Sequence, residues 1–204
     1  FSSNIYNVDF YQLGYCYHQQ KNYDKAVSEF NKIIGGNDAV AQNAYYHLGE
    51  SYLSLDQKTQ ALNAFKNASE MNFSTKIQED AYANYAKLSY EIGNPYKSVP
   101  AVLTDFLTQY PQTPYKQELN DLLVDSYIST KNYQAALDIL ETNKMLFQEI
   151  NSFINNEVST QNNIISFKVD TFLSLSDYLK EQVLFEILKK HNLSKTLIEE
   201  LIDQ

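Results

Sequence analysis

The sequence predicts an all-α fold, a right-handed solenoid of helical hairpins that ends in a C-terminal helical cap. The 204 residues are 44% apolar and 20% charged, with four Pro and five Gly, which is the composition of a globular chain. A pattern of aromatic, Leu, Gly and Ala residues recurs after 35 residues, and such self-similarity is typical of stacked repeats. No apolar run approaches the ~20 residues that a membrane-spanning helix needs.

The first two predicted hairpins, residues 8–40 and 43–75, carry the recurring pattern most clearly. Its members are Phe10, Leu13, Gly14, Tyr17, Ala26 and Phe30 in the first copy, and Tyr45, Leu48, Gly49, Tyr52, Ala61 and Phe65 in the second. The small Gly and Ala residues let two helix backbones approach, and the aromatic rings fill the space beside them. Short polar breaks at 21–24 and 56–59 make each helix pair antiparallel.

The third and fourth hairpins, residues 80–111 and 115–145, repeat the pattern less completely. The third has a longer turn at 93–96, and its Pro100 falls early in the second helix, where proline is tolerated. The last aromatic residues of the four first helices are Tyr17, Tyr52, Tyr90 and Tyr127, at spacings of 35, 38 and 37 residues. We therefore expect four units within residues 1–140.

Residues 141–204 form a divergent helical region. The polar stretch 155–163 predicts a loop or a helix break. A degenerate fifth repeat is suggested by Phe172 and Phe185, although Lys168 and Glu181 replace its packing residues, and the alternation of residues 164–175 also suits a strand. The helical spacing of apolar residues after Ser194 predicts a capping helix.

This pattern resembles the tetratricopeptide repeat, and residues 106–115 are similar to the inter-repeat signature of bacterial cell-envelope scaffold proteins with such repeats. The resemblance implies a protein-interaction scaffold in a bacterial envelope assembly, with a periplasmic or envelope-associated location; a cytoplasmic location is the alternative. The chain begins at Phe1 without an initiator Met, so we expect it to be part of a longer product.

The resemblance also implies that the first helices line a concave groove, in which a peptide or partner protein binds. The positions that contact ligand in this family correspond to Tyr11, Tyr15, His18, Gln19, Asn43, Tyr46, Glu50, Leu53, Asn84, Leu88, Glu118, Asp121 and Asp125, and the same mapping covers Val8 and Ile128. Such a groove is aromatic at one end and acidic at the other, which suits a partner with apolar anchors and basic residues. The alternative is that these are ordinary solvated side chains.

The sequence predicts no catalytic residue, no cofactor and no metal site. It contains no zinc-type Cys/His spacing, phosphate-binding glycine loop or nucleophile elbow. His18 and His47 fall near the groove, where they could serve as metal ligands or as a base, but partly exposed polar residues are the simpler interpretation. Cys16 is expected to be a small buried side chain. The net charge of -9 and the absence of Arg argue against nucleic acid as a partner.

Two alternative functions are open at this stage, and the sequence does not specify the oligomeric state. One is a structural envelope component that self-associates through its convex face or through residues 141–204. The other is an enzyme or carrier whose site lies in that C-terminal region, lined by Asp170, Asp177, Glu181 or His191.

Overall fold

The computed structural model describes residues 2–161, 164–167, 169–175, 180, 183, 184 and 187. The chain divides into two compact units, residues 1–132 and 133–204. Helices predominate in the described residues, and those of the first unit pack in series. The predicted all-α solenoid of helical hairpins is therefore confirmed.

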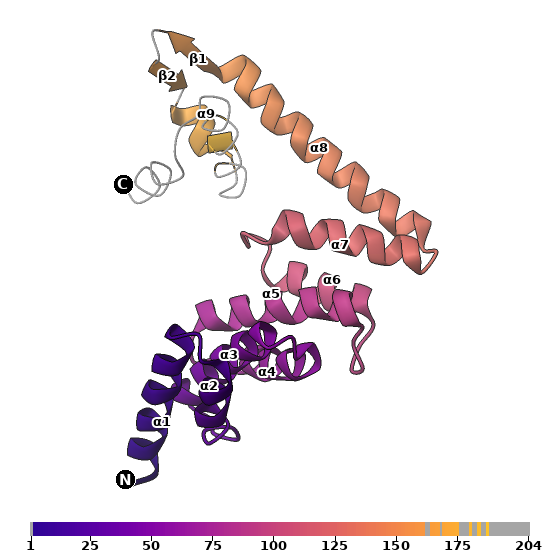
Figure 1. The fold of residues 1–204 in the computed structure, drawn as a ribbon. Coiled ribbons are helices and arrows are strands. Elements are labelled where there is room, and N and C mark those ends of the chain that lie inside the picture. Colours follow the sequence, from indigo (N-terminus) through magenta and orange to yellow (C-terminus); the bar gives the residue numbers. More distant parts are fainter. Residues whose placement is uncertain are drawn as a thin grey trace. The chain divides into compact units, whose positions relative to one another are not determined.

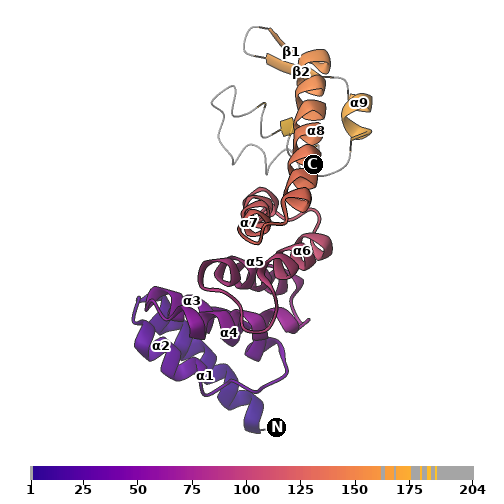
Figure 2. The same ribbon diagram turned by 90° about the vertical axis from the view of Figure 1, so that its right-hand side faces the viewer.

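The first unit consists of three complete helical hairpins followed by a single helix (Figures 1 and 2). Its helices are α1 (Ser2–Gln19), α2 (Tyr23–Phe30), α3 (Ala39–Ser54), α4 (Lys58–Glu70), α5 (Thr75–Ile92), α6 (Val99–Gln109) and α7 (Lys116–Ser129). Helix α1 contacts α3, α3 contacts α5, and α5 contacts α7, so the first helices form one layer. Each of α2, α4 and α6 packs against its own first helix and against the next one.

Close helix packing depends on the predicted small residues. A Cβ atom added to Gly14 would lie 2.8 Å from Cε1 of Phe30, and one added to Gly49 would lie 2.7 Å from Cε1 of Phe65. Both rings are fully buried. The two hairpins therefore pack in the same way: in each, the phenyl ring of the second helix of the hairpin fills the space beside the glycine of its first helix.

The turn that follows a first helix also repeats. Lys21, Asp56 and Lys131 adopt the left-handed conformation, with φ of 59°, 57° and 61°. The amide that follows each of them donates to a carbonyl five residues back, at 2.8–2.9 Å. This is the Schellman motif, in which glycine is the usual left-handed residue. In the third hairpin Gly93 has a positive φ, of 79°.

A buried glutamine fastens the second hairpin to the third. Gln42 is fully buried, and its Nε2 donates to the carbonyls of Ala68, Met71 and Ser74 at 3.2, 2.7 and 3.3 Å. Its Oε1 accepts from the Ser74 amide at 2.7 Å. One side chain thus provides hydrogen-bond partners for half-buried backbone groups of the turn between α4 and α5, among them the Met71 carbonyl and the Ser74 amide.

The second unit begins with α8 (Tyr133–Glu157), which leads into the antiparallel strands β1 (Val158–Gln161) and β2 (Ile164–Phe167) and then into α9 (Val169–Leu173). Helix α8 thus ends within the helix break predicted at residues 155–163. Strand β2 covers the start of residues 164–175, whose alternation of apolar and polar residues suits a strand. Ile150, Phe153, Val183 and Ile187 form a small core of this unit. The predicted packing positions Lys168, Glu181 and Phe185, the side chains of Asp177 and His191, and the capping helix lie outside the described residues.

Candidate partner-binding face

Six side chains of α1 and α3 come together on one surface, which we call the first-helix face: Tyr11, Tyr15, His18, Tyr46, His47 and Glu50. Tyr11, Tyr15 and His18 share one side of α1 because they are spaced by four and three residues. The ring centroids of Tyr11 and Tyr15 are 6.2 Å apart, and those of Tyr15 and His47 are 5.1 Å apart. The mapping of ligand positions had selected five of these six residues, and the sequence had also placed the sixth, His47, near the groove.

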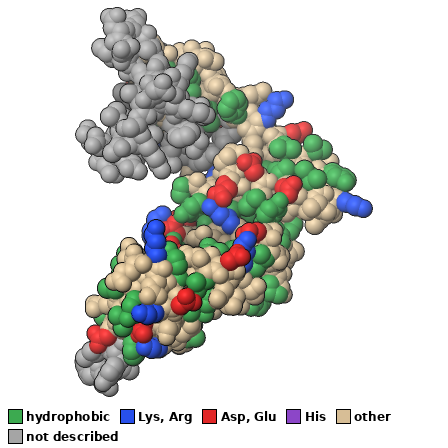
Figure 3. All heavy atoms as spheres, in the orientation of Figure 1, with side chains coloured by type: hydrophobic (Ala, Val, Ile, Leu, Met, Phe, Trp, Pro, Cys, Tyr) green, Lys and Arg blue, Asp and Glu red, His purple; other side chains and the backbone are tan. Residues whose placement is uncertain are grey.

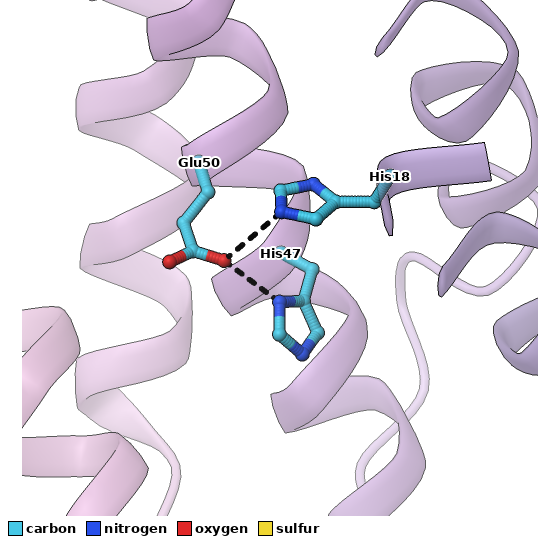
Figure 4. Close-up of side chains that lie close together, drawn as sticks. All are labelled: His18, His47 and Glu50. Atoms are coloured by element: carbon cyan, nitrogen blue, oxygen red, sulfur yellow. Dashed lines mark hydrogen bonds and ion pairs between the residues drawn. The ribbon is translucent and has the colours of Figure 1, made fainter. Parts of the chain in front are cut away.

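A carboxylate lies between the two histidines of this face (Figure 4). Oε2 of Glu50 is 2.8 Å from Nδ1 of His47 and 3.7 Å from Nε2 of His18. Nδ1 of His18 is 3.0 Å from Oγ of Ser51, whose hydroxyl donates to the His47 carbonyl at 2.7 Å. Among the described residues, His18, His47 and Glu50 are the one group of three His, Cys, Asp or Glu side chains with ligand atoms within 4.8 Å of one another.

Burial dominates the electrostatics of this face. It lowers the pKa of His18, against the opposing effect of the Glu50 charge. Burial also raises the pKa of Tyr11 and of Tyr46, and the nearby Glu50 carboxylate raises both further. Both tyrosines therefore keep their hydroxyl protons at neutral pH.

The predicted acidic end lies on α7, and its three carboxylates have partners within the first unit. Glu118 pairs with Lys87 of α5 at 2.6 Å, and Asp125 accepts a hydrogen bond from Tyr90. Oδ1 of Asp121 accepts a hydrogen bond from the side-chain amide of Gln117 at 3.0 Å. All three residues are exposed, so a ligand can reach them, but a basic partner would compete with Lys87 for Glu118.

The remaining predicted positions differ in how accessible they are. Leu88 is only 4% exposed and belongs to the core. Asn43 and Asn84 each donate to a carbonyl of their own helix, at 2.7 and 2.9 Å. Gln19 is exposed and Leu53 is half-buried. Of these five, Leu88 cannot contact a ligand in the described conformation.

Asp80, Lys87 and Tyr115, which the sequence did not single out, extend this surface from α3 towards α7. The hydroxyl of Tyr115 donates to Asp80 at 2.8 Å, which raises the Tyr115 pKa to about 12 together with the larger effect of burial. The ammonium of Lys87 lies 4.7 Å from the centre of the Tyr115 ring. These contacts join residues of α5 to the start of α7, and the repeat pattern contained no signal for them because they occur only once.

Other features of the first unit lie away from this face. Cys16 is exposed, so the prediction of a buried thiol was wrong: it points outward from α1. A hollow of about 550 Å³ is lined by Pro100, Thr104 and Tyr127 of α6 and α7, among others. On the side of residues 1–132 that Figure 3 shows, basic and acidic side chains are interspersed. No described helix is both long and apolar enough to cross a membrane.

Comparison with known families agrees with this architecture. Residues 10–35 and 42–75 match the family model of the tetratricopeptide repeat; these are the hairpins α1–α2 and α3–α4. No curated protein matches the chain. The match and the helices packed in series support a tetratricopeptide repeat protein, a class that generally mediates protein–protein interaction and is typically not enzymatic.

Proposed function

We propose that this chain is a non-enzymatic interaction scaffold that binds a peptide or a segment of a partner protein on the first-helix face. The observation that carries the proposal is the grouping of Tyr11, Tyr15 and Tyr46 around His47 on two adjacent helices. Tyr15 is 39% exposed although it is an aromatic residue. Tyrosine on a rigid support gives contact area at little cost in conformational entropy.

The charges of the surface define the chemistry of the ligand. Glu50 is 34% exposed beside the aromatic rings, and Asp121 and Asp125 are exposed on α7. An apolar or aromatic anchor would occupy the tyrosine end, and a Lys or Arg further along would meet the carboxylates, which fixes the direction of the bound segment. Lys87, which pairs with Glu118 at 2.6 Å, would disfavour a basic group of the partner at that carboxylate.

The proposed location is a bacterial envelope assembly, with the chain in the periplasm or attached to the envelope. The support is the similarity of residues 106–115 to the inter-repeat signature of envelope scaffold proteins. In the structure this segment ends α6 and turns into α7, with Thr113 buried and its hydroxyl near the Tyr115 amide, at 3.4 Å. A partner that itself resides in the envelope would support this location.

The experiment is an affinity capture from envelope and cytosolic fractions, with the purified chain and two variants as bait. The face variant carries Tyr11→Ala, Tyr15→Ala and Tyr46→Ala. The control variant carries Ile34→Ala, Phe73→Ala and Tyr96→Ala, which removes apolar groups that are 47%, 46% and 58% exposed and lie outside the face. Far-UV circular dichroism and thermal unfolding establish that both variants are folded.

A partner that the parent and the control variant capture, and that the folded face variant does not, supports the proposal. Equal capture by all three baits contradicts binding on the first-helix face and directs attention to the second unit. The fraction in which the partner is found tests the proposed location separately.

A second candidate function, self-association within an assembly, is favoured by exposed apolar groups of the second unit. Met145 is 70% exposed, Phe147 58% and Leu173 60%, and exposed apolar side chains that gather into a patch mark interaction sites. The test is the molar mass by light scattering across a wide concentration range, for the parent and for a variant with Met145→Glu and Phe147→Glu. A mass that rises with concentration only in the parent supports this candidate; a constant monomer mass contradicts it.

A further inference from the structure

We propose that His18, His47 and Glu50 form a binding site for one zinc ion, which joins the first hairpin to the second. His18 comes from α1, whereas His47 and Glu50 come from α3 and share one side of that helix because they are three residues apart. Figure 4 shows the three polar ends directed towards one another. Two imidazoles and one carboxylate make up a common zinc ligand set, in which a fourth position remains for water.

The hydrogen bonds around His18 determine which of its nitrogens is free. The hydroxyl proton of Ser51 is donated to the His47 carbonyl, so Oγ of Ser51 must accept the proton of Nδ1 of His18 at 3.0 Å. Nε2 of neutral His18 then carries a lone pair. That lone pair faces Oε2 of Glu50 at 3.7 Å, and a cation bound between the two groups would attract both of them.

The polar neighbours of the cluster supply the support that metal ligands require. Ser51 is fully buried and orients His18 through Nδ1, and its own hydroxyl is held by the His47 carbonyl at 2.7 Å. Partners of this kind fix the tautomer and direction of a ligand, and their loss weakens metal binding about 10–100-fold.

The distances suit a small transition-metal ion after a modest adjustment. Zinc bonds of about 2.0–2.1 Å in a tetrahedron place neighbouring ligand atoms roughly 3.3 Å apart. The two distances to Oε2 of Glu50, 2.8 and 3.7 Å, lie on either side of that value. Glu50 is the most exposed of the three side chains, at 34% compared with 16% and 17% for the histidines, so its rotation accommodates the ion. Zinc bound at Nδ1 of His47 requires the tautomer of the neutral imidazole that carries its proton on Nε2.

Aromatic rings enclose the site and limit the motion of the imidazoles. Tyr15 and Tyr46 lie 5.1 and 5.4 Å from His47, between ring centroids, and Tyr23 lies 5.5 Å from His18. Imidazole nitrogens favour zinc and its neighbours in the transition series over magnesium and calcium, which prefer oxygen ligands. Because its ligands come from both helices, a bound zinc ion would stabilise the contact between α1 and α3. This stabilisation does not require a peptide on the first-helix face.

The test is titration of the complete chain, without an affinity tag, with Zn²⁺, Co²⁺ and Mg²⁺, by calorimetry and visible absorption. The ligand variants are His18→Gln, His47→Gln and Glu50→Gln. The matched control is His191→Gln, because the chain has three histidines and this substitution removes the third. Ser51→Ala tests the supporting contact while it retains all three ligands, and circular dichroism confirms helical content.

We expect one Zn²⁺ per chain for the parent and for His191→Gln, the absorption of tetrahedral Co²⁺, and no response to Mg²⁺. Each folded ligand variant should bind Zn²⁺ at least about tenfold more weakly. Zn²⁺ should raise the melting temperature of the parent and of His191→Gln by more than that of any ligand variant. The proposal is overturned if the parent binds no Zn²⁺, if all the folded ligand variants bind it as tightly as the parent, or if His191→Gln weakens it equally. If a histidine variant fails to fold, Glu50→Gln and Ser51→Ala decide the outcome.

Discussion

Replacement of Gly49 by alanine tests the close packing of α3 against α4. The added Cβ would lie 2.7 Å from Cε1 and 2.8 Å from both Cδ1 and Cζ of Phe65, whereas ordinary van der Waals contact begins at 3.4 Å. The ring would have to retreat by about 0.7 Å, and it is fully buried. Overpacking of this kind costs about 1–3 kcal/mol.

A second effect of the substitution has the opposite sign. Alanine in a helix interior is favoured over glycine by about 1 kcal/mol. The net expectation is that Gly49→Ala lowers the free energy of unfolding by about 1 kcal/mol, within a range of about 0–2 kcal/mol. In a background with Phe65→Leu, where the ring is gone, the same substitution should be neutral or stabilising.

The assay is urea denaturation followed by far-UV circular dichroism for the parent, both single variants and the double variant. Hydrogen exchange of α3 amides assigns the transition to the first unit. We expect a coupling energy between the two positions of about 1–3 kcal/mol. If Gly49→Ala stabilises the parent by about 1 kcal/mol, as at an exposed helix position, the described contact between Gly49 and Phe65 is wrong.

Two further predictions concern single residues of the repeat framework. Asp56→Gly should raise the free energy of unfolding by up to about 1 kcal/mol, because glycine takes the left-handed φ without the steric cost of a Cβ; Asp56→Val should lower it, and urea denaturation of both variants checks this. Gln42→Leu should lower the free energy of unfolding by about 1–3 kcal/mol, because it removes the hydrogen-bond partner of the half-buried Met71 carbonyl and Ser74 amide. The same measurement on Asn43→Ala, which loses only a bond within its own helix, should show a change of less than about 1 kcal/mol.

The repeat framework could be predicted from the sequence because it depends on local spacing and residue size. Gly14 and Gly49 recur at the same position in two hairpins, and each faces a phenylalanine of the following helix. The inter-helix turns were also predicted, but not their left-handed residues, since Lys21, Asp56 and Lys131 are not glycine. Helical geometry at both sides of the turn imposes that conformation on them.

The candidate site was predicted only in part, because its geometry depends on contacts between repeats. The mapping placed His18 and Glu50 on the same surface, but it could not show that Glu50 also reaches His47 or that Ser51 orients His18. It also placed Leu88 on the surface, where the structure buries it. The irregular register of the third hairpin explains this last difference.

The second unit was the least predictable part of the chain. Its β-hairpin has only four residues in each strand, and the alternating pattern of residues 164–175 was compatible with both a strand and a degenerate repeat. Phe167 and Phe172 lie 4.9 Å apart between ring centroids in the core of this unit. A core assembled from β2, α9 and α8 has no counterpart in a repeating pattern.

The central claim, that the first-helix face binds a protein segment, is tested most directly by the affinity of one peptide for three forms of the chain. The peptide is the shortest binding segment of the captured partner, and calorimetry measures its dissociation constant for the parent, the face variant and the control variant. We expect the folded face variant to bind at least about tenfold more weakly than the parent, equivalent to about 1.4 kcal/mol, and the control variant to match the parent. Equal dissociation constants for all three forms would contradict the claim.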